Sequence, residues 1–112
     1  SAKRFTSQMY KSGSFMCLSF HIKKTLPLGK GGMILTDNKE AYEWLKRAVY
    51  FGRRPIDHLA EHFDMLGWNY YMLPEIAARG LVLMLGIEDD NKDLEIEYQD
   101  LSKYKVYTEA NR

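Results

Sequence analysis

The sequence predicts an α/β chain made of a short β-hairpin followed by helices, and one that is incomplete as a fold on its own. Two short apolar segments with strand character, 15–22 and 33–36, precede two segments with helical spacing. Two strands cannot form the helix-covered parallel sheet that such apolar runs usually build, and a lone hairpin is only marginally stable in water. We therefore expect the 112 residues to form one partial domain whose strands belong to a larger sheet.

The first strand is expected at 15–22, because apolar side chains alternate along it. Side chains of a strand point to opposite faces in turn. One face would hold Met16, Leu18, Phe20 and Ile22, whereas the other face is mixed in character. The apolar face is the expected contact with the core.

The helix after the second strand is the best-marked element. Asp37 is expected to be its N-cap, with Glu40 three residues later as in a capping box. Gly52 is expected to close the helix at the C′ position. Its apolar residues recur at helical spacing: Ala41, Trp44, Leu45, Ala48 and Val49.

Two further helices are expected downstream. A short one is expected at 57–63, and a longer one from Pro74 to about Leu85, because proline suits the first helical turn. Gly86 is expected to end the longer helix. The acidic and polar residues 86–112 would then form a tail.

Composition and charge exclude several classes of protein. No apolar run approaches the roughly 20 residues of a membrane helix, and the N-terminal residues lack the apolar core of a signal peptide. Cys17 is the only cysteine, so an internal disulfide is excluded. We expect a cytoplasmic protein without a membrane partner.

The net charge of +1 is unevenly distributed. Residues 1–55 carry 11 Lys and Arg against 3 Asp and Glu, and residues 1–12 read as a polar, basic loop or frayed start. A basic half suits an anion such as a phosphate, although two ordinary solvated faces explain the same pattern. No nucleic-acid-binding motif accompanies the charge, so we expect no nucleic-acid partner.

The residues with the clearest chemical potential surround Lys24, which follows the first strand and precedes the glycine-rich turn 29–32. An amine that captures an aldehyde must be deprotonated, and the basic neighbour Lys23 would favour a lowered pKa. The hydroxyl of Ser19 can hydrogen-bond a phosphate, and glycines let a ligand approach the backbone. Taken alone, this pattern is more often that of an ordinary exposed lysine.

Several motifs nevertheless occur in a fixed order between residues 13 and 85. They are, along the chain, Ser19-Phe20-His21 with Lys24, Leu26-Pro27-Leu28-Gly29 with Gly31-Gly32-Met33 and Thr36, Phe51-Gly52-Arg53, Leu66-Gly67-Trp68-Asn69-Tyr70-Tyr71-Met72, and Glu75-Ile76-Ala77-Ala78-Arg79-Gly80-Leu81. This series resembles the DegT/DnrJ/EryC1/StrS family of sugar aminotransferases, which depend on pyridoxal phosphate (PLP).

The resemblance implies the large domain of the type I aminotransferase fold and a homodimer with shared active sites. It implies amino transfer from an amino acid to a keto-sugar nucleotide, through a Schiff base between Lys24 and PLP. Ser19 would contact the cofactor phosphate, and Asn69 would reach the phosphate of the other subunit's cofactor. The residues themselves leave a second interpretation of Asn69 open, as a left-handed turn residue after Gly67.

The sequence departs from the family pattern in two ways. Ile22, Lys23 and Thr25 replace the more usual Pro, Thr and Asn around the lysine, and Lys30 stands where Glu is common. The family's N-terminal half, with the phosphate-cradling turn, the stacked aromatic ring and the aspartate on the pyridine nitrogen, has no counterpart in these residues. That aspartate makes the ring an electron sink. We therefore expect the fragment to be inactive by itself, with a non-catalytic, self-associating interaction module as the alternative.

One competing motif lies outside that series. His58, Glu61 and His62 match the H-x-x-E-H pattern of inverted zinc peptidases. The two histidines would share a face if residues 57–63 were helical. A third ligand is not evident, and so short a pattern arises easily by chance, so we expect no metal site.

Overall fold

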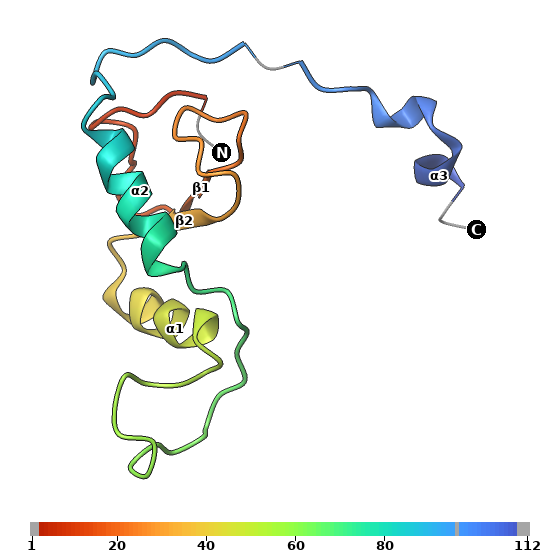
Figure 1. The fold of residues 1–112 in the computed structure, drawn as a ribbon. Coiled ribbons are helices and arrows are strands. Elements are labelled where there is room, and N and C mark those ends of the chain that lie inside the picture. The colour runs from red at the N-terminus through yellow and green to blue at the C-terminus, as the bar shows by residue number, and fades with distance from the viewer. Residues whose placement is uncertain (1–2, 96, 110–112) are drawn as a thin grey trace.

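The computed structural model describes residues 3–95 and 97–109. Its elements are β1 (Met16–Ser19), β2 (Gly32–Leu35), α1 (Lys39–Val49), α2 (Pro74–Met84), a 3-10 helix (Leu101–Lys103) and α3 (Lys105–Thr108). In Figure 1, α2 lies beside the hairpin, α1 lies below it, and the segment that carries α3 extends away from both. The described residues thus form a small α/β structure, as predicted.

The two strands pair antiparallel, with Met16 opposite Leu35 and Ser19 opposite Gly32. The pairing is close at Gly32, where an added Cβ would meet the Leu18 carbonyl oxygen. β1 is shorter than the predicted segment 15–22, because the chain turns after Phe20. The β1–β2 connection then closes on itself, and Phe20 N–H donates to the Gly31 carbonyl at 3.0 Å.

The core lies where this connection folds back on β1. Leu18, Phe20, Leu26 and Leu28 are buried. The predicted apolar face is confirmed at Leu18 and Phe20, and it is wrong at Ile22, which is 68% exposed. Alternation ends with the strand, so a residue beyond the turn no longer shares its face.

Helix α2 covers one side of this core. Pro74 lies in its first turn, and the helix ends at Met84, close to the predicted end. Gly80 is the buried residue of α2, and an added Cβ there would lie 3.2 Å from Leu28 Cδ1. The small residue therefore allows α2 to approach the β1–β2 connection closely.

Helix α1 forms as predicted, but its ends are displaced. Asn38, not Asp37, caps the N-terminus, and its Oδ1 accepts from Ala41 N–H at 3.0 Å. Asp37 is engaged elsewhere, because its carboxylate accepts from Gly13 N–H at 3.0 Å and from the Ser12 hydroxyl. The C-cap is Tyr50, so Gly52 occupies the C″ position rather than the predicted C′ position. The Gly52 N–H donates to the Arg47 carbonyl at 2.8 Å.

The short helix predicted at 57–63 is wrong. Residues 57–60 form a single turn, in which Ala60 N–H donates to the Asp57 carbonyl at 3.0 Å. The side chain of Glu61 is only 3% exposed and pairs with Arg54 at 3.1 Å. This ion pair draws the loop back toward the end of α1 and stops the turn from propagating.

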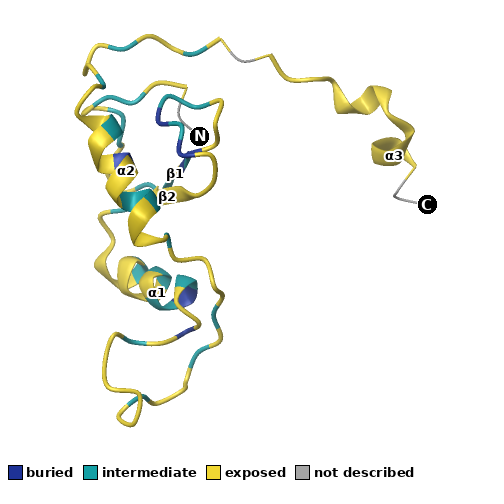
Figure 2. Ribbon diagram, in the orientation of Figure 1, coloured by how far each residue is buried: buried dark blue, intermediate teal, exposed yellow. Residues whose placement is uncertain are grey.

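Burial is confined to a small part of the chain (Figure 2). α1 and α2 each bury one residue, Ala48 and Gly80, and the described residues of the predicted tail are largely exposed. Among the described residues, no helix is long and apolar enough to cross a membrane. The many exposed large apolar residues leave surfaces that a partner could cover.

Candidate functional site

Lys24 lies in the first turn after β1. Its backbone N–H donates to the His21 carbonyl at 2.9 Å, which closes a tight turn. Buried Phe20 and Leu26 flank this turn, and Leu28 N–H returns to the Phe20 carbonyl at 3.0 Å. The chain's own core therefore fixes the backbone that presents Lys24, whose side chain is half-buried.

Ser19 is the last residue of β1 and is also half-buried. Its hydroxyl oxygen accepts from His21 N–H at 3.3 Å, and Lys23 N–H donates to His21 Nδ1 at 3.2 Å. These short-range bonds hold the strand end and the turn as one unit. Ser19 and Lys24 are thus presented by the same small unit.

The Lys24 amine contacts the C-terminal segment. Its Nζ donates to the hydroxyl of Tyr98 at 2.8 Å and lies 5.5 Å from the centre of that ring. The hydrogen bond from Lys24 lowers the pKa of the Tyr98 phenol; burial opposes this, and the charges of Lys24, Lys3 and Lys23 add to it. Within the described residues, Lys24 forms no ion pair with a carboxylate.

Asn69 lies on a different strip of backbone. It forms an isolated antiparallel bridge with Tyr50, at the end of α1. Tyr70 N–H donates to the Val49 carbonyl at 2.9 Å. Asn69 does not have a positive φ, because Phe51 is the one non-glycine residue of the described ranges that has one. The left-handed interpretation of Asn69 is therefore wrong, because a bridge to α1 holds this residue instead.

Asn69 lines a hollow together with the glycine-rich turn, and Lys24 does not line that hollow. This hollow of about 520 Å³ is lined by Asn69, Lys30, Gly31, Gly32 and Met72, together with neighbours of Asn69. Ser19 and Lys24 do not line it. Within one chain, the structure therefore brings Ser19 and Lys24 together and places Asn69 apart from them.

The residues of the H-x-x-E-H motif lie on a turn and loop rather than on a helix. The described residues contain no group of histidine, cysteine and acidic side chains arranged to hold an ion. Glu61 is bound to both the backbone N–H and the side chain of Arg54. The helix face that His58 and His62 would share is missing, because residues 57–63 are not helical.

Sequence reasoning missed an ion-pair network that anchors the loop after α1. The carboxylate of Asp64 binds Arg47 and, at 2.9 Å, Arg54. Hydrogen bonds from Arg47 and then Arg54 lower the pKa of Asp64 to about 2. The composition of the segment signals charge, but not which charges meet.

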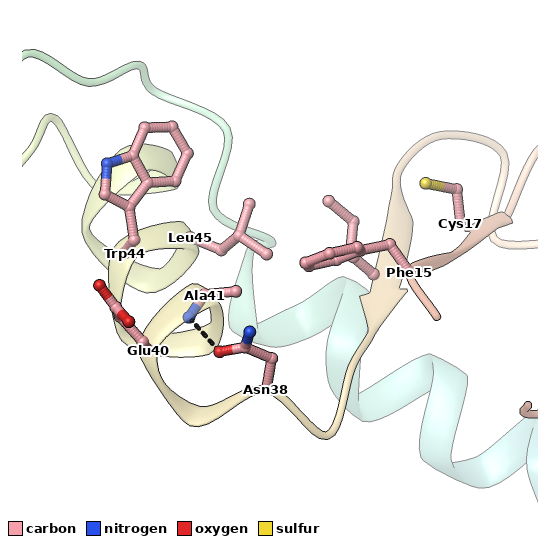
Figure 3. Close-up of a pocket in the computed structure, with 8 residues that line it drawn as sticks. Phe15, Cys17, Asn38, Glu40, Ala41, Trp44 and Leu45 are labelled. Carbon is pink, nitrogen blue, oxygen red and sulfur yellow. Dashed lines mark hydrogen bonds between the residues drawn. The ribbon is translucent and has the colours of Figure 1, made fainter. Parts of the chain in front are cut away.

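A separate apolar hollow lies between β1 and α1 (Figure 3). Phe15 and Cys17 face it from the strand side, and Trp44 and Leu45 face it from the helix. Its volume is about 580 Å³, and none of Ser19, Lys24 and Asn69 lines it. It is an uncovered face of the hairpin rather than part of the lysine site.

The family model of the DegT/DnrJ/EryC1/StrS aminotransferases matches residues 7–101 of the chain. The chain belongs to this family. A GDP-perosamine synthase of Escherichia coli O157:H7 is 33% identical over 95 residues, which cover 84% of this chain and 25% of that protein. The chain thus spans a quarter of the length of this relative. No solved structure matches it.

Aminotransferases of this family depend on PLP, and the chemistry of Lys24 and Ser19 fits the aldehyde and the phosphate of that cofactor. The turn presents a primary amine that is not tied to a carboxylate in the described part of the chain. The Ser19 hydroxyl lies five positions earlier on the same unit, as a donor suited to a phosphate oxygen. Lys24 would therefore hold the aldehyde end and Ser19 the phosphate end.

Proposed function

We propose that this chain is the lysine-bearing segment of a PLP-dependent sugar aminotransferase, with Lys24 as the cofactor lysine. The observation that carries the proposal is the position of Lys24. It lies in a turn fixed by the buried core at the end of β1, within a segment that matches the family. A surface lysine on an unsupported loop would have no such fixed backbone.

Each residue has a defined task in this proposal. The Lys24 amine would hold the cofactor at its aldehyde and would carry protons at Nζ. The Ser19 hydroxyl donates to the cofactor phosphate. PLP supplies an electron sink for the bond changes at the amino-bearing carbon.

The substrate class follows from the relative. Its name denotes a synthase of a GDP-linked amino sugar, so we propose a nucleotide-linked keto sugar as amino acceptor and an amino acid as donor. The basic first half of the chain suits the phosphates of such a substrate. The 112 residues alone are expected to show no appreciable turnover, because the aspartate on the pyridine nitrogen belongs to the family's N-terminal half, which has no counterpart in these residues.

The proposal places Asn69 in the site of a second subunit. Its amide can donate two hydrogen bonds to phosphate oxygens without adding charge, and Asn69 itself is exposed. Exposed aromatic residues surround it, with Trp68 and Tyr70 stacked at 6.3 Å between ring centres. Such residues are typical of protein interfaces, which supports a homodimer with shared sites.

A PLP titration of a full-length homologue that carries this segment tests the role of Asn69. Asn69→Asp puts a negative charge beside the phosphate and should weaken PLP binding about tenfold or more, as expected for loss of a hydrogen bond to a charged group. Tyr70→Phe is the matched control in the same exposed strip. Unchanged PLP affinity in Asn69→Asp would remove Asn69 from the site.

The absorption spectrum of the chain with added PLP tests Lys24. The wild type and Lys30→Ala should shift the cofactor band in the same way, whereas Lys24→Ala should leave the spectrum of free PLP. An identical band shift in Lys24→Ala would assign the amine to another lysine.

The second candidate function is a non-catalytic, self-associating interaction module. Exposed apolar residues on both helices and on the hairpin favour it. The two candidates differ in their response to PLP, since an interaction module would associate without shifting the cofactor band.

A further inference from the structure

Residues 88–95 run back along residues 3–7 as the first part of an arm. Phe5 N–H donates to Asn91 Oδ1 at 2.9 Å, and Asn91 Nδ2 donates to the Phe5 carbonyl at 2.6 Å. Leu94 N–H donates to the Lys3 carbonyl at 2.8 Å. These backbone-directed bonds join positions 86 or more residues apart, so the arm has a defined path over the N-terminal residues.

The same N-terminal residues contact the turn that carries Lys24. Thr25, the next residue, donates its hydroxyl to the Lys3 carbonyl at 2.9 Å. The ion pair between Arg4 and Asp93 at 3.1 Å adds a further tie, although both side chains are exposed and such pairs contribute little. The arm and the lysine turn therefore meet at one carbonyl, that of Lys3.

Tyr98 ends the arm over the Lys24 amine. The Nζ–O distance of 2.8 Å and the 5.5 Å between Nζ and the ring centre are two separate attractive contacts. The hydroxyl and the ring of Tyr98 therefore both engage the Lys24 amine. The hydrogen bond from Lys24 also lowers the pKa of the Tyr98 phenol.

A charged amine cannot attack a carbonyl. Lys24 must first release one proton to solvent, so that the nitrogen lone pair can form a bond to the aldehyde carbon. The two remaining amine hydrogens then leave with the carbonyl oxygen as water. Tyr98 occupies the space beside Nζ, and its hydrogen bond to the amine must break before the nitrogen can bond to the aldehyde carbon.

We propose that residues 88–95, together with 97 and 98, form an autoinhibitory arm, in which Tyr98 holds the Lys24 amine until an aldehyde or another part of the protein displaces it. The contact joins residues 74 positions apart and is made by the described residues alone. The proposal rests on the proposed function in that Lys24 is the reacting amine. It adds a residue, Tyr98, that controls when the amine is available.

Reductive methylation with formaldehyde and cyanoborohydride tests the arm without PLP. Methylation of each lysine is followed by mass spectrometry, with Lys30 as the internal reference. Tyr98→Phe keeps the ring and removes the hydroxyl, so the Lys24 rate relative to Lys30 should rise roughly tenfold, as the loss of a hydrogen bond to a charged group allows. An unchanged ratio would overturn the proposal.

Two further variants sharpen the test. Asn91→Ala removes both bonds of Asn91 to Phe5 without touching Tyr98, and should raise the Lys24 rate in the same direction by a smaller factor. Tyr104→Phe removes another exposed tyrosine hydroxyl of the C-terminal segment, which bonds Gln99 at 2.9 Å, and should change nothing. An equal rise in Tyr104→Phe would overturn the specific role of Tyr98.

The same variants separate the arm from the proposed function. If Tyr98→Phe accelerates methylation of Lys24 while PLP fails to select Lys24, the arm stands and the cofactor assignment fails. If PLP selects Lys24 and Tyr98→Phe alters neither reaction, the cofactor assignment stands and the arm is overturned.

Discussion

Lys24 and Asn69 belong to two regions that are held in place in different ways. The Lys24 turn rests on a core of buried apolar side chains, whereas Asn69 lies on an exposed strip held by backbone hydrogen bonds to the end of α1. Burial in its own chain positions the first residue. The second region presents exposed side chains at 68–70, as the proposed contact with another subunit requires.

Removing the core beneath Lys24 should have the largest effect. Phe20 is 3% exposed, and Phe20→Ala should lower the free energy of unfolding by about 3–5 kcal/mol, from lost burial and the cavity left behind. Ile22→Ala is the matched control at the exposed end of the same segment, with an expected change within about 0.5 kcal/mol. Denaturant unfolding measures both. Similar losses in the two variants would contradict the core assignment.

A side chain at Gly67 should disturb the Asn69 strip by a smaller amount. An added Cβ would meet backbone atoms of Gly52 and Ala48, so Gly67→Ala should cost about 1–3 kcal/mol, as overpacking does. The amide protons of Trp68 and Tyr70, which donate to α1 carbonyls, should exchange faster with solvent.

Gly86→Ala is the control for this variant, because its added Cβ would meet only ordinary contacts. It should leave the exchange of the Trp68 and Tyr70 amides unchanged. Unaltered exchange in Gly67→Ala would show that the strip does not depend on its close approach to α1.

Acid should release the loop beside that strip, with the smallest effect of the three. The pKa of Asp64 is lowered from 3.8 to about 2, so its pairs with Arg47 and Arg54 stabilise the folded state above pH 3.8. This stabilisation is lost as the pH falls toward about 2. A nuclear magnetic resonance titration of residues 53–66 should show the transition, and Asp64→Asn should abolish it. The same transition in Asp64→Asn would assign it to another group.

Local signals were sufficient to predict the hairpin and the two long helices. Their apolar spacing, Pro74 and the glycines act within a few residues, and the structure confirms them. The N-cap was misplaced by one residue because Asp37 and Asn38 have similar capping preferences. The choice is made by a distant contact, since Ser12 and Gly13 occupy the Asp37 carboxylate.

Contacts between distant residues explain the other failures. The helix predicted at 57–63 does not form, because Arg54 pairs with Glu61 and Asp64. No local pattern indicates which charges meet. The contact between Lys24 and Tyr98 is equally invisible in the sequence, because its partners are 74 residues apart and lie on segments without regular structure.

The sequence motifs identified Ser19, Lys24 and Asn69 as candidate site residues, but they did not predict how the three residues are arranged in space. Ser19 and Lys24 share one strand end, which their spacing of five residues predicts. Asn69 was placed in another subunit's site by resemblance alone. The structure shows it beside the glycine-rich turn, apart from Lys24 of its own chain.

Borohydride reduction of the protein in the presence of PLP, followed by peptide mapping, tests the central claim most directly. The account predicts that the phosphopyridoxyl group is found on the peptide containing Lys24, well above its level on Lys23, Lys30 or other lysines. Uniform labelling across the exposed lysines would contradict the assignment of Lys24 as the cofactor lysine.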